Sequence, residues 1–239
     1  MRQRSIVTLF IAGLSVTALA GCSSSSSSSS TTTTTTTTSQ ALVGTFRLTA
    51  GAQSGATVSG TYFRMVQPGG TVATGPFFSN PDSTAADKTY TLLVPGSGGG
   101  LATGTFQPNP NPAFDNSGDA LAHQIVLPAK FAGNEFGVST NPTDPQTSAT
   151  VHAPAITSTG GKLSGQVGAW TVSWNKLYFN QGSPKPNGTS PGRTSSVSGT
   201  YDSTTHAFVI TWASQIVGGP YNGFTGSWHL QGTFAAGAK

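Results

Sequence analysis

The chain has 239 residues, only 8% of them Asp, Glu, Lys or Arg, and a formal net charge of +4. Loss of an N-terminal segment with Arg2 and Arg4 would leave nine Lys and Arg against seven Asp and Glu, a balance of +2. These basic residues are scattered, which argues against a nucleic-acid partner. Abundant Gly, Pro, Ser and Thr, with few Glu, Lys and Leu, favour strands over helices.

Residues 1–21 have the composition of a secretory signal peptide. Arg2 and Arg4 form a basic start, and an apolar stretch runs from Ile6 to Ala18. This stretch is shorter than the roughly 20 residues that a membrane-spanning helix needs. The sequence therefore predicts that residues 1–21 are removed during export.

The end of this segment, Leu19-Ala20-Gly21-Cys22, resembles the lipobox of bacterial lipoproteins. The resemblance implies that the Cys22 sulfur receives a diacylglyceryl group and that cleavage occurs just before it, often followed by acylation of the new α-amino group. Such chains would anchor the protein in the cell membrane or outer membrane, facing the periplasm or the exterior, because stable attachment takes two or more lipid chains. Cys22 is the only cysteine, so no disulfide is expected.

An unbroken run of Ser and Thr follows Cys22 and extends to Ser39. Hydroxyl side chains cannot bury apolar surface, so we expect residues 22–40 to form a disordered tether. As a flexible coil the run would span roughly 20–25 Å on average. The remaining residues, 41–239, are predicted to form a single all-β domain.

Short candidate strands alternate with loops rich in Gly, Pro, Asn and Ser, and none of them has an apolar period of helical length. Such a pattern predicts an antiparallel β-sandwich or β-barrel with long Gly/Pro-rich loops. The candidate strands are 42–49, 57–66, 88–94, 100–106, 121–127, 135–139, 148–152, 162–167, 169–179, 196–201, 206–216 and 223–234.

No motif in the chain predicts a catalytic residue, a metal site or a cofactor. The four histidines do not form H-x-H or H-E-x-x-H arrangements, and there is no G-x-S-x-G, P-loop or dinucleotide-binding motif. Asp115, Ser117 and Asp119 are spaced as at the start of a calcium loop. However, Ala120 and Val126 stand where its glycine and glutamate belong. A Ser-His-Asp triad assembled from distant strands remains an alternative, because triads are defined by geometry rather than by order.

Aromatic residues concentrated in the last third of the chain are the clearest candidates for ligand binding. In "AWTVSWNKLYF" one strand would place two tryptophans and a tyrosine on one side, 170, 174 and 178. Such a face can line a ligand cavity, stack against sugar rings or form core. The candidate ligand-binding residues are Tyr62, Trp170, Trp174, Tyr178, Trp212 and Trp228.

The segments "GTFRLTAGAQSGATVSGTY" and "WTVSWNKLY" resemble strand motifs of the avidin family, in the same order. The resemblance implies an up-and-down barrel in which Tyr62 and Trp174 would face biotin. Leu48 stands where the family's first strand offers an asparagine, and no aspartate near the end of the chain matches the family's pattern.

Together these features predict a lipid-anchored lipoprotein of the bacterial cell envelope. Its β-domain would act as a binding or structural module, with a small molecule, a glycan or an envelope protein as its ligand. The alternative is a secreted, membrane-anchored hydrolase. A pocket lined by Trp or Tyr would favour the binding module, whereas a histidine close to both a serine hydroxyl and a carboxylate would favour the enzyme.

Overall fold

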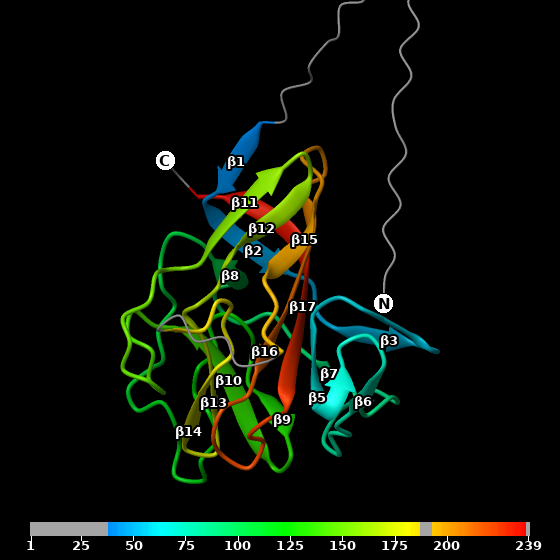
Figure 1. Ribbon diagram of the computed structural model, residues 1–239, viewed down its shortest axis with the longest axis vertical. Helices are drawn as coiled ribbons and strands as arrows, with labels where there is room; N and C mark the ends of the chain where they lie inside the picture. Colours follow the sequence, from blue (N-terminus) through cyan, green and yellow to red (C-terminus); the bar gives the residue numbers. More distant parts are fainter. Residues whose placement is uncertain (1–37, 187–192, 238–239) are drawn as a thin grey trace, which may run out of the picture. The chain divides into compact units, whose positions relative to one another are not determined.

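The computed structural model describes residues 38–186 and 193–237 (Figure 1). The predicted signal peptide, Cys22 and nearly all of the hydroxyl tract lie outside the described residues. Every strand pair is antiparallel and the described residues contain no α-helix, which confirms the all-β prediction. Within the described part of the chain, no helix is long and apolar enough to cross a membrane.

The strands are short, as the frequent turn residues predict, and only three of them exceed seven residues. They are β1 (Ser39–Leu42), β2 (Gly44–Leu48), β3 (Ala52–Ser54), β4 (Thr57–Ser59), β5 (Tyr62–Thr71), β6 (Gly75–Phe77), β7 (Thr91–Leu92), β8 (Gly100–Ala102), β9 (Ala129–Phe131), β10 (Asn134–Thr140), β11 (Ala155–Thr159), β12 (Lys162–Gln166), β13 (Trp170–Trp174), β14 (Leu177–Asn180), β15 (Val197–Tyr201), β16 (Ala207–Gln215) and β17 (Thr225–Ala236).

A large sheet in the order β1-β11-β12-β15-β16-β17-β2-β8 curls into a half-barrel, with β5 also paired to β17 and with β6 and β7 paired to β5. The long strand β17 organises this sheet. One edge of β17 pairs with β16. Its other edge pairs first with β5 and then, beyond Gln231, with β2. Figure 1 shows β17 running from the level of β2 down to the level of β9.

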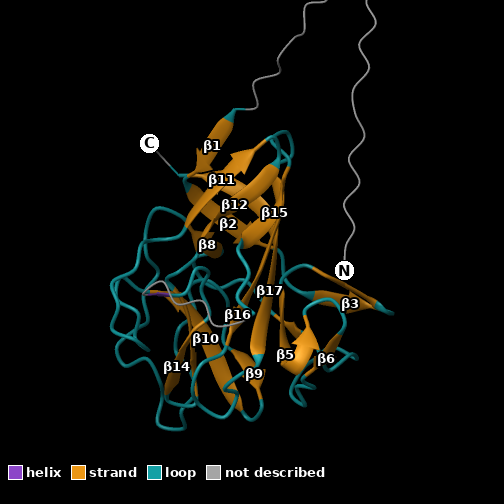
Figure 2. Ribbon diagram, in the orientation of Figure 1, coloured by secondary structure: helices purple, strands orange, loops and turns teal. Residues whose placement is uncertain are grey.

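A second sheet, β14-β13-β10-β9, packs against the part of the large sheet formed by β5, β16 and β17 (Figure 2). Strand alternation explains the core on the inner face of the large sheet, because alternate residues of β16 (Phe208, Ile210 and Trp212) are at most 2% exposed. Trp212 packs against Trp170 of the second sheet, whereas Phe208 packs against Phe46 of β2. The opposite face of the second sheet is also covered: Ser173 on β13 is fully buried and its hydroxyl donates to Asn109 in a long loop. The small hairpin β3–β4 forms a separate two-stranded sheet.

The expected single strand 169–179 is wrong, because β13 and β14 form a hairpin. Asn175 and Lys176 both have positive φ, 48° and 61°, as the two central residues of a tight hairpin turn require. The hairpin pairs Trp174 with Leu177 and Ser173 with Tyr178. As a result, the faces predicted for one continuous strand hold only for its first half.

Two other expected strands are also absent, and the first strand begins before the expected end of the tether at residue 40. Residues 121–127 bond to the glycine-rich loop 95–99 instead of to a neighbouring strand. Residues 148–152 contribute one isolated bridge, at Thr150. Ser39 already pairs with Thr159, so β1 starts inside the segment expected to be tether.

Candidate functional site

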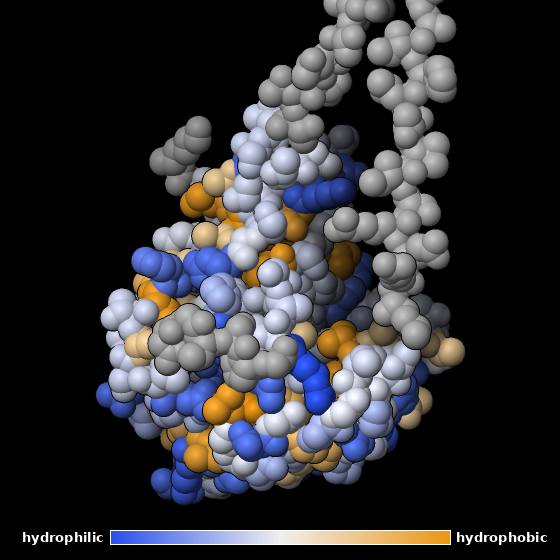
Figure 3. All heavy atoms as spheres, in the orientation of Figure 1, coloured by the Kyte–Doolittle hydropathy of each residue, from blue (hydrophilic) through white to orange (hydrophobic). Residues whose placement is uncertain are grey.

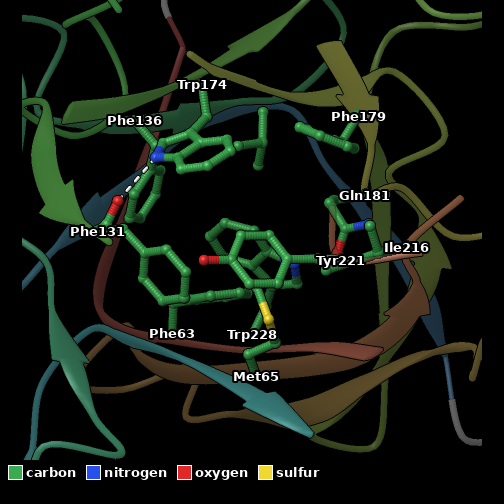
Figure 4. Close-up of a pocket in the computed structure, with 11 residues that line it drawn as sticks. Phe63, Met65, Phe131, Phe136, Trp174, Phe179, Gln181, Ile216, Tyr221 and Trp228 are labelled. Atoms are coloured by element: carbon green, nitrogen blue, oxygen red, sulfur yellow. Dashed lines mark hydrogen bonds between the residues drawn. The ribbon is translucent and has the colours of Figure 1, made fainter. Parts of the chain in front are cut away.

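An aromatic cavity lies between the inner face of the large sheet and the second sheet (Figure 4). Its volume is about 40 Å³, and its exposed surface is apolar. A cavity of this size can hold water only where polar groups bond it, so an apolar lining favours an apolar occupant. The lining residues are Phe63, Met65, Phe131, Phe136, Val172, Trp174, Phe179, Gln181, Ile216, Tyr221 and Trp228.

Both sheets supply the walls through the two-residue period of their strands. Phe63 and Met65 are alternate residues of β5, and Val172 and Trp174 are alternate residues of β13. The indole Nε1 of Trp174 donates to the carbonyl of Phe131, at 2.7 Å. This bond crosses from β13 to β9 and fixes the Trp174 ring as one wall of the cavity (Figure 4).

Tyr221 covers the cavity from the loop that joins β16 to β17. Its ring centroid lies 5.5 Å from that of Trp174 and 5.8 Å from that of Phe131. Figure 4 shows the Tyr221 ring reaching across the cavity. Burial raises the pKa of its hydroxyl. The loop contains Gly218 and Gly219, both with positive φ, so its backbone takes a path that other residues disfavour.

The cavity wall contains two polar atoms that have no partner among the described residues. They are the side-chain oxygen of Gln181 and the indole nitrogen of Trp228. The Gln181 amide nitrogen donates to the neighbouring carbonyl of Asn180, at 3.2 Å. An unpaired buried polar group costs roughly 1–3 kcal/mol. One acceptor and one donor therefore lie unpaired behind the apolar surface.

Of the six aromatic residues proposed from the sequence, Trp174 and Trp228 line this cavity. Trp170 and Trp212 lie deeper: they pack against each other edge to face at 5.1 Å, and Trp212 Nε1 donates to the carbonyl of Gln181. These two are core residues. The remaining two, Tyr62 and Tyr178, lie elsewhere, so the six residues do not form one site.

Tyr62 and Tyr178 are each one position away from a residue that lines the cavity. Phe63 follows Tyr62 on β5, and Phe179 follows Tyr178 on β14. Since successive side chains alternate between faces, Tyr62 and Tyr178 point away from the cavity. Tyr62 instead stacks on His229 at 4.5 Å, and Tyr178 packs against a phenylalanine of a loop, at position 114.

Sequence reasoning missed most of the cavity wall, which is built from phenylalanines and from Tyr221. The phenylalanines at 131 and 136 meet across the hairpin β9–β10, but they reach Phe63 only across strands that are distant in sequence. The strand period alone could have identified Phe63, because it alternates with Met65 on β5. No local signal places the loop residue Tyr221.

The correspondence with avidin does not produce a shared site. Trp174 lines the cavity, whereas Tyr62 lies on the opposite face of β5, so the two residues do not face a common pocket. A comparison of the chain with known protein families, with curated proteins and with solved structures finds no match.

The histidines bond to groups other than those of a catalytic triad. His123 Nδ1 pairs with the carbonyl of Leu121, and His206 Nδ1 pairs with the Tyr201 hydroxyl. Among residues 38–186 and 193–237, no hydrogen bond joins a histidine ring to a serine hydroxyl or a carboxylate; the Ser97 hydroxyl donates to the backbone carbonyl of His123. In the same residues, no group of three His, Cys, Asp or Glu side chains could hold a metal ion.

The segment that begins like a calcium loop forms a hydrogen-bonded turn. The Asp115 carboxylate accepts from the backbone N–H of Asp119, at 2.9 Å. The Asp119 carboxylate in turn accepts from the backbone N–H of Glu135, at 2.7 Å. The Asp115 carboxylate thus closes the turn, and the Asp119 carboxylate ties it to β10.

Proposed function

We propose that this chain is a lipid-anchored lipoprotein of the bacterial cell envelope whose β-domain binds a small, mainly apolar molecule. The observation that carries the proposal is the aromatic cavity between the sheets. A pocket lined by Trp and Tyr is the feature expected of a binding module, and it supports this proposal. The lipobox-like segment that ends at Cys22 supports the anchor and the exported location.

An apolar ligand suits this cavity because the surface that its walls present is apolar, while the unpaired atoms of Gln181 and Trp228 lie behind that surface. A flat ring could enter among Phe63, Trp174 and Tyr221, where ring edges and faces surround it on several sides. The present volume fits only a small group, so a larger ligand requires the loop that carries Tyr221 to move outward. A ligand with a polar group could also reach the unpaired atoms of Gln181 and Trp228 once these side chains adjust.

Toluene serves as a probe of the cavity in the full-length protein. Toluene is larger than the present cavity, so it enters only when the loop that carries Tyr221 moves outward. Burying roughly 200 Å² of its surface contributes about 5 kcal/mol, and opening the loop offsets part of this gain, so we expect a Kd of about 1 mM or weaker. Because Trp174 and Trp228 line the cavity, binding is expected to change tryptophan fluorescence saturably and to raise the Tm. The variant Val172→Phe fills part of the cavity and is expected to weaken binding at least tenfold.

The matched control is Val209→Phe, which adds the same atoms on β16 outside the cavity. We expect toluene to bind Val209→Phe as it binds the wild type. If Val172→Phe bound toluene as tightly as the wild type does, or if no saturable binding occurred, the cavity would not be a ligand site.

The anchor is tested separately by metabolic labelling with a fatty acid. We expect the wild-type protein to incorporate the label and Cys22→Ala to lose it completely, because no other cysteine can take its place. Variant Ser23→Ala is the control and should retain the label. Equal labelling of wild type and Cys22→Ala would overturn the anchor but would leave the cavity proposal intact.

A further inference from the structure

A groove of about 360 Å³ lies on the outer face of the large sheet, over β5, β16 and β17. These strands also form one wall of the aromatic cavity on their inner face. The register places two rows of side chains across the groove. Tyr62, His229 and Thr211 form one row, and Arg64, Ser227 and Ala213 form the next. The groove is thus a built surface, distinct from the cavity behind it.

Arg64 supplies a fixed positive charge to this groove. Its guanidinium carbon lies 3.2 Å from the ring centroid of Phe77 and 4.1 Å from that of Tyr90, so two aromatic rings clamp it. Its Nη2 donates to the Thr89 hydroxyl at 2.9 Å, and its Nε has no partner among the described residues. Burial lowers the pKa of Arg64 from its usual value, but an arginine remains charged at neutral pH.

No acidic side chain neutralises this charge within the groove. The described residues that line it include no Asp or Glu. Asp87 interacts with Arg64 electrostatically, but it does not line the groove. Among the described residues that line the groove, Arg64 is the one Lys, Arg, Asp or Glu, so the charge that a ligand meets there is positive.

The rest of the floor combines hydroxyl groups with a flat aromatic pair. Ser195, Thr211 and Ser227 bring hydroxyls to the groove. The rings of Tyr62 and His229 stack within 4° of parallel. Burial lowers the pKa of His229, and a hydrogen bond between its imidazole and the Gln231 side chain opposes this shift. One ring nitrogen of His229 is thus left for a ligand.

We propose that this groove binds a sugar unit that carries a carboxylate. The serine and threonine hydroxyls match the hydroxyls of the sugar, and the aromatic pair offers a flat surface to the C–H groups of its ring. Arg64 recognises the carboxylate, because a guanidinium forms its strongest hydrogen bonds with such anions. This ligand class differs from the apolar occupant of the cavity, and the two sites are independent proposals.

The test is a titration of the full-length protein with glucuronate, followed by ¹H–¹⁵N NMR. We expect saturable shifts at Ser227 and His229, and binding at least tenfold weaker for glucose and for acetate. Arg64→Gln is expected to weaken glucuronate binding at least tenfold. Arg47→Gln is the matched control, because Arg47 is an exposed arginine on β2 outside the groove, and it should bind like the wild type.

A second variant keeps the test decisive if Arg64→Gln disturbs the aromatic clamp. Ser227→Leu keeps Arg64 but fills the floor beside it, because Ser227 pairs with Arg64 across the strands. This variant is expected to abolish the shifts, whereas Thr233→Leu, on the same face of β17, should not. Val172→Phe should bind glucuronate normally, which separates the groove from the cavity. Glucose or acetate binding as tightly as glucuronate, no binding at all, or wild-type binding by both Arg64→Gln and Ser227→Leu would overturn the proposal.

Discussion

Replacing Trp228 by alanine is expected to lower the free energy of unfolding by about 4 kcal/mol, because the change removes a large side chain from the centre of the core. Trp228 is 1% exposed. Its ring lies 4.6 Å from Phe63, 5.2 Å from Trp170 and 5.9 Å from Trp212, so it joins β5, β13 and β16. Urea denaturation of the two proteins measures the difference.

A comparison of two phenylalanine variants separates packing from hydrogen bonding. The indole N–H of Trp228 has no partner among the described residues, so Trp228→Phe loses packing but also removes an unsatisfied donor. The N–H of Trp212 donates to the carbonyl of Gln181 at 2.8 Å. We therefore expect Trp212→Phe to cost roughly 1–2 kcal/mol more than Trp228→Phe. Equal costs would contradict this assignment.

The stability of the protein is expected to rise with pH between about 8 and 10.5 relative to that of the variant Lys185→Met. Burial lowers the pKa of Lys185 from 10.5 to about 8, and Asp144 opposes this shift only in part. Below pH 8 the amine is charged in both the folded and the unfolded protein, so the full penalty of burying the charge applies. Above pH 8 the folded protein releases the proton first, and the penalty disappears by pH 10.5.

The size of this effect follows from the pKa difference, since each pKa unit corresponds to about 1.4 kcal/mol. The difference in free energy of unfolding between Lys185→Met and the wild type should therefore favour the variant by up to about 3 kcal/mol more at pH 7.5 than it does at pH 10.5. Tyrosine ionisation affects both proteins and cancels in the difference. Lys162→Met controls for the loss of one positive charge on the surface. A wild-type-to-Lys185→Met difference that stayed constant with pH would show that Lys185 is not a buried charge.

The fold class was predictable because it depends on local features of the chain. Turn residues interrupt the sequence often, and β-branched and aromatic residues fill the segments between them. Strands such as β12, β15 and β16 consequently lie within a residue or two of their expected bounds. Segment 121–127 was predicted wrongly because its backbone groups bond to a glycine-rich loop, and a choice between such partners is made only in three dimensions.

The candidate site was predictable only in its chemistry. Trp174 and Trp228 were expected to face a ligand, and both line the cavity. The hairpin turn at 175–176 changes which side chains of the following strand face the cavity, so Phe179 lines it instead of Tyr178. A change of one position in a strand moves a side chain to the other face, and the sequence does not mark where that change occurs.

The sequence by itself determined that the described chain forms antiparallel strands, because strand propensity and turn residues act over a few neighbouring positions. Only the tertiary structure decided which aromatic residues meet. Strand β17 places Trp228 against β13 on one face and His229 beside Tyr62 on the other. These contacts join residues far apart in the sequence, and they depend on the register of β17 with β5 and β16, which long-range packing fixes.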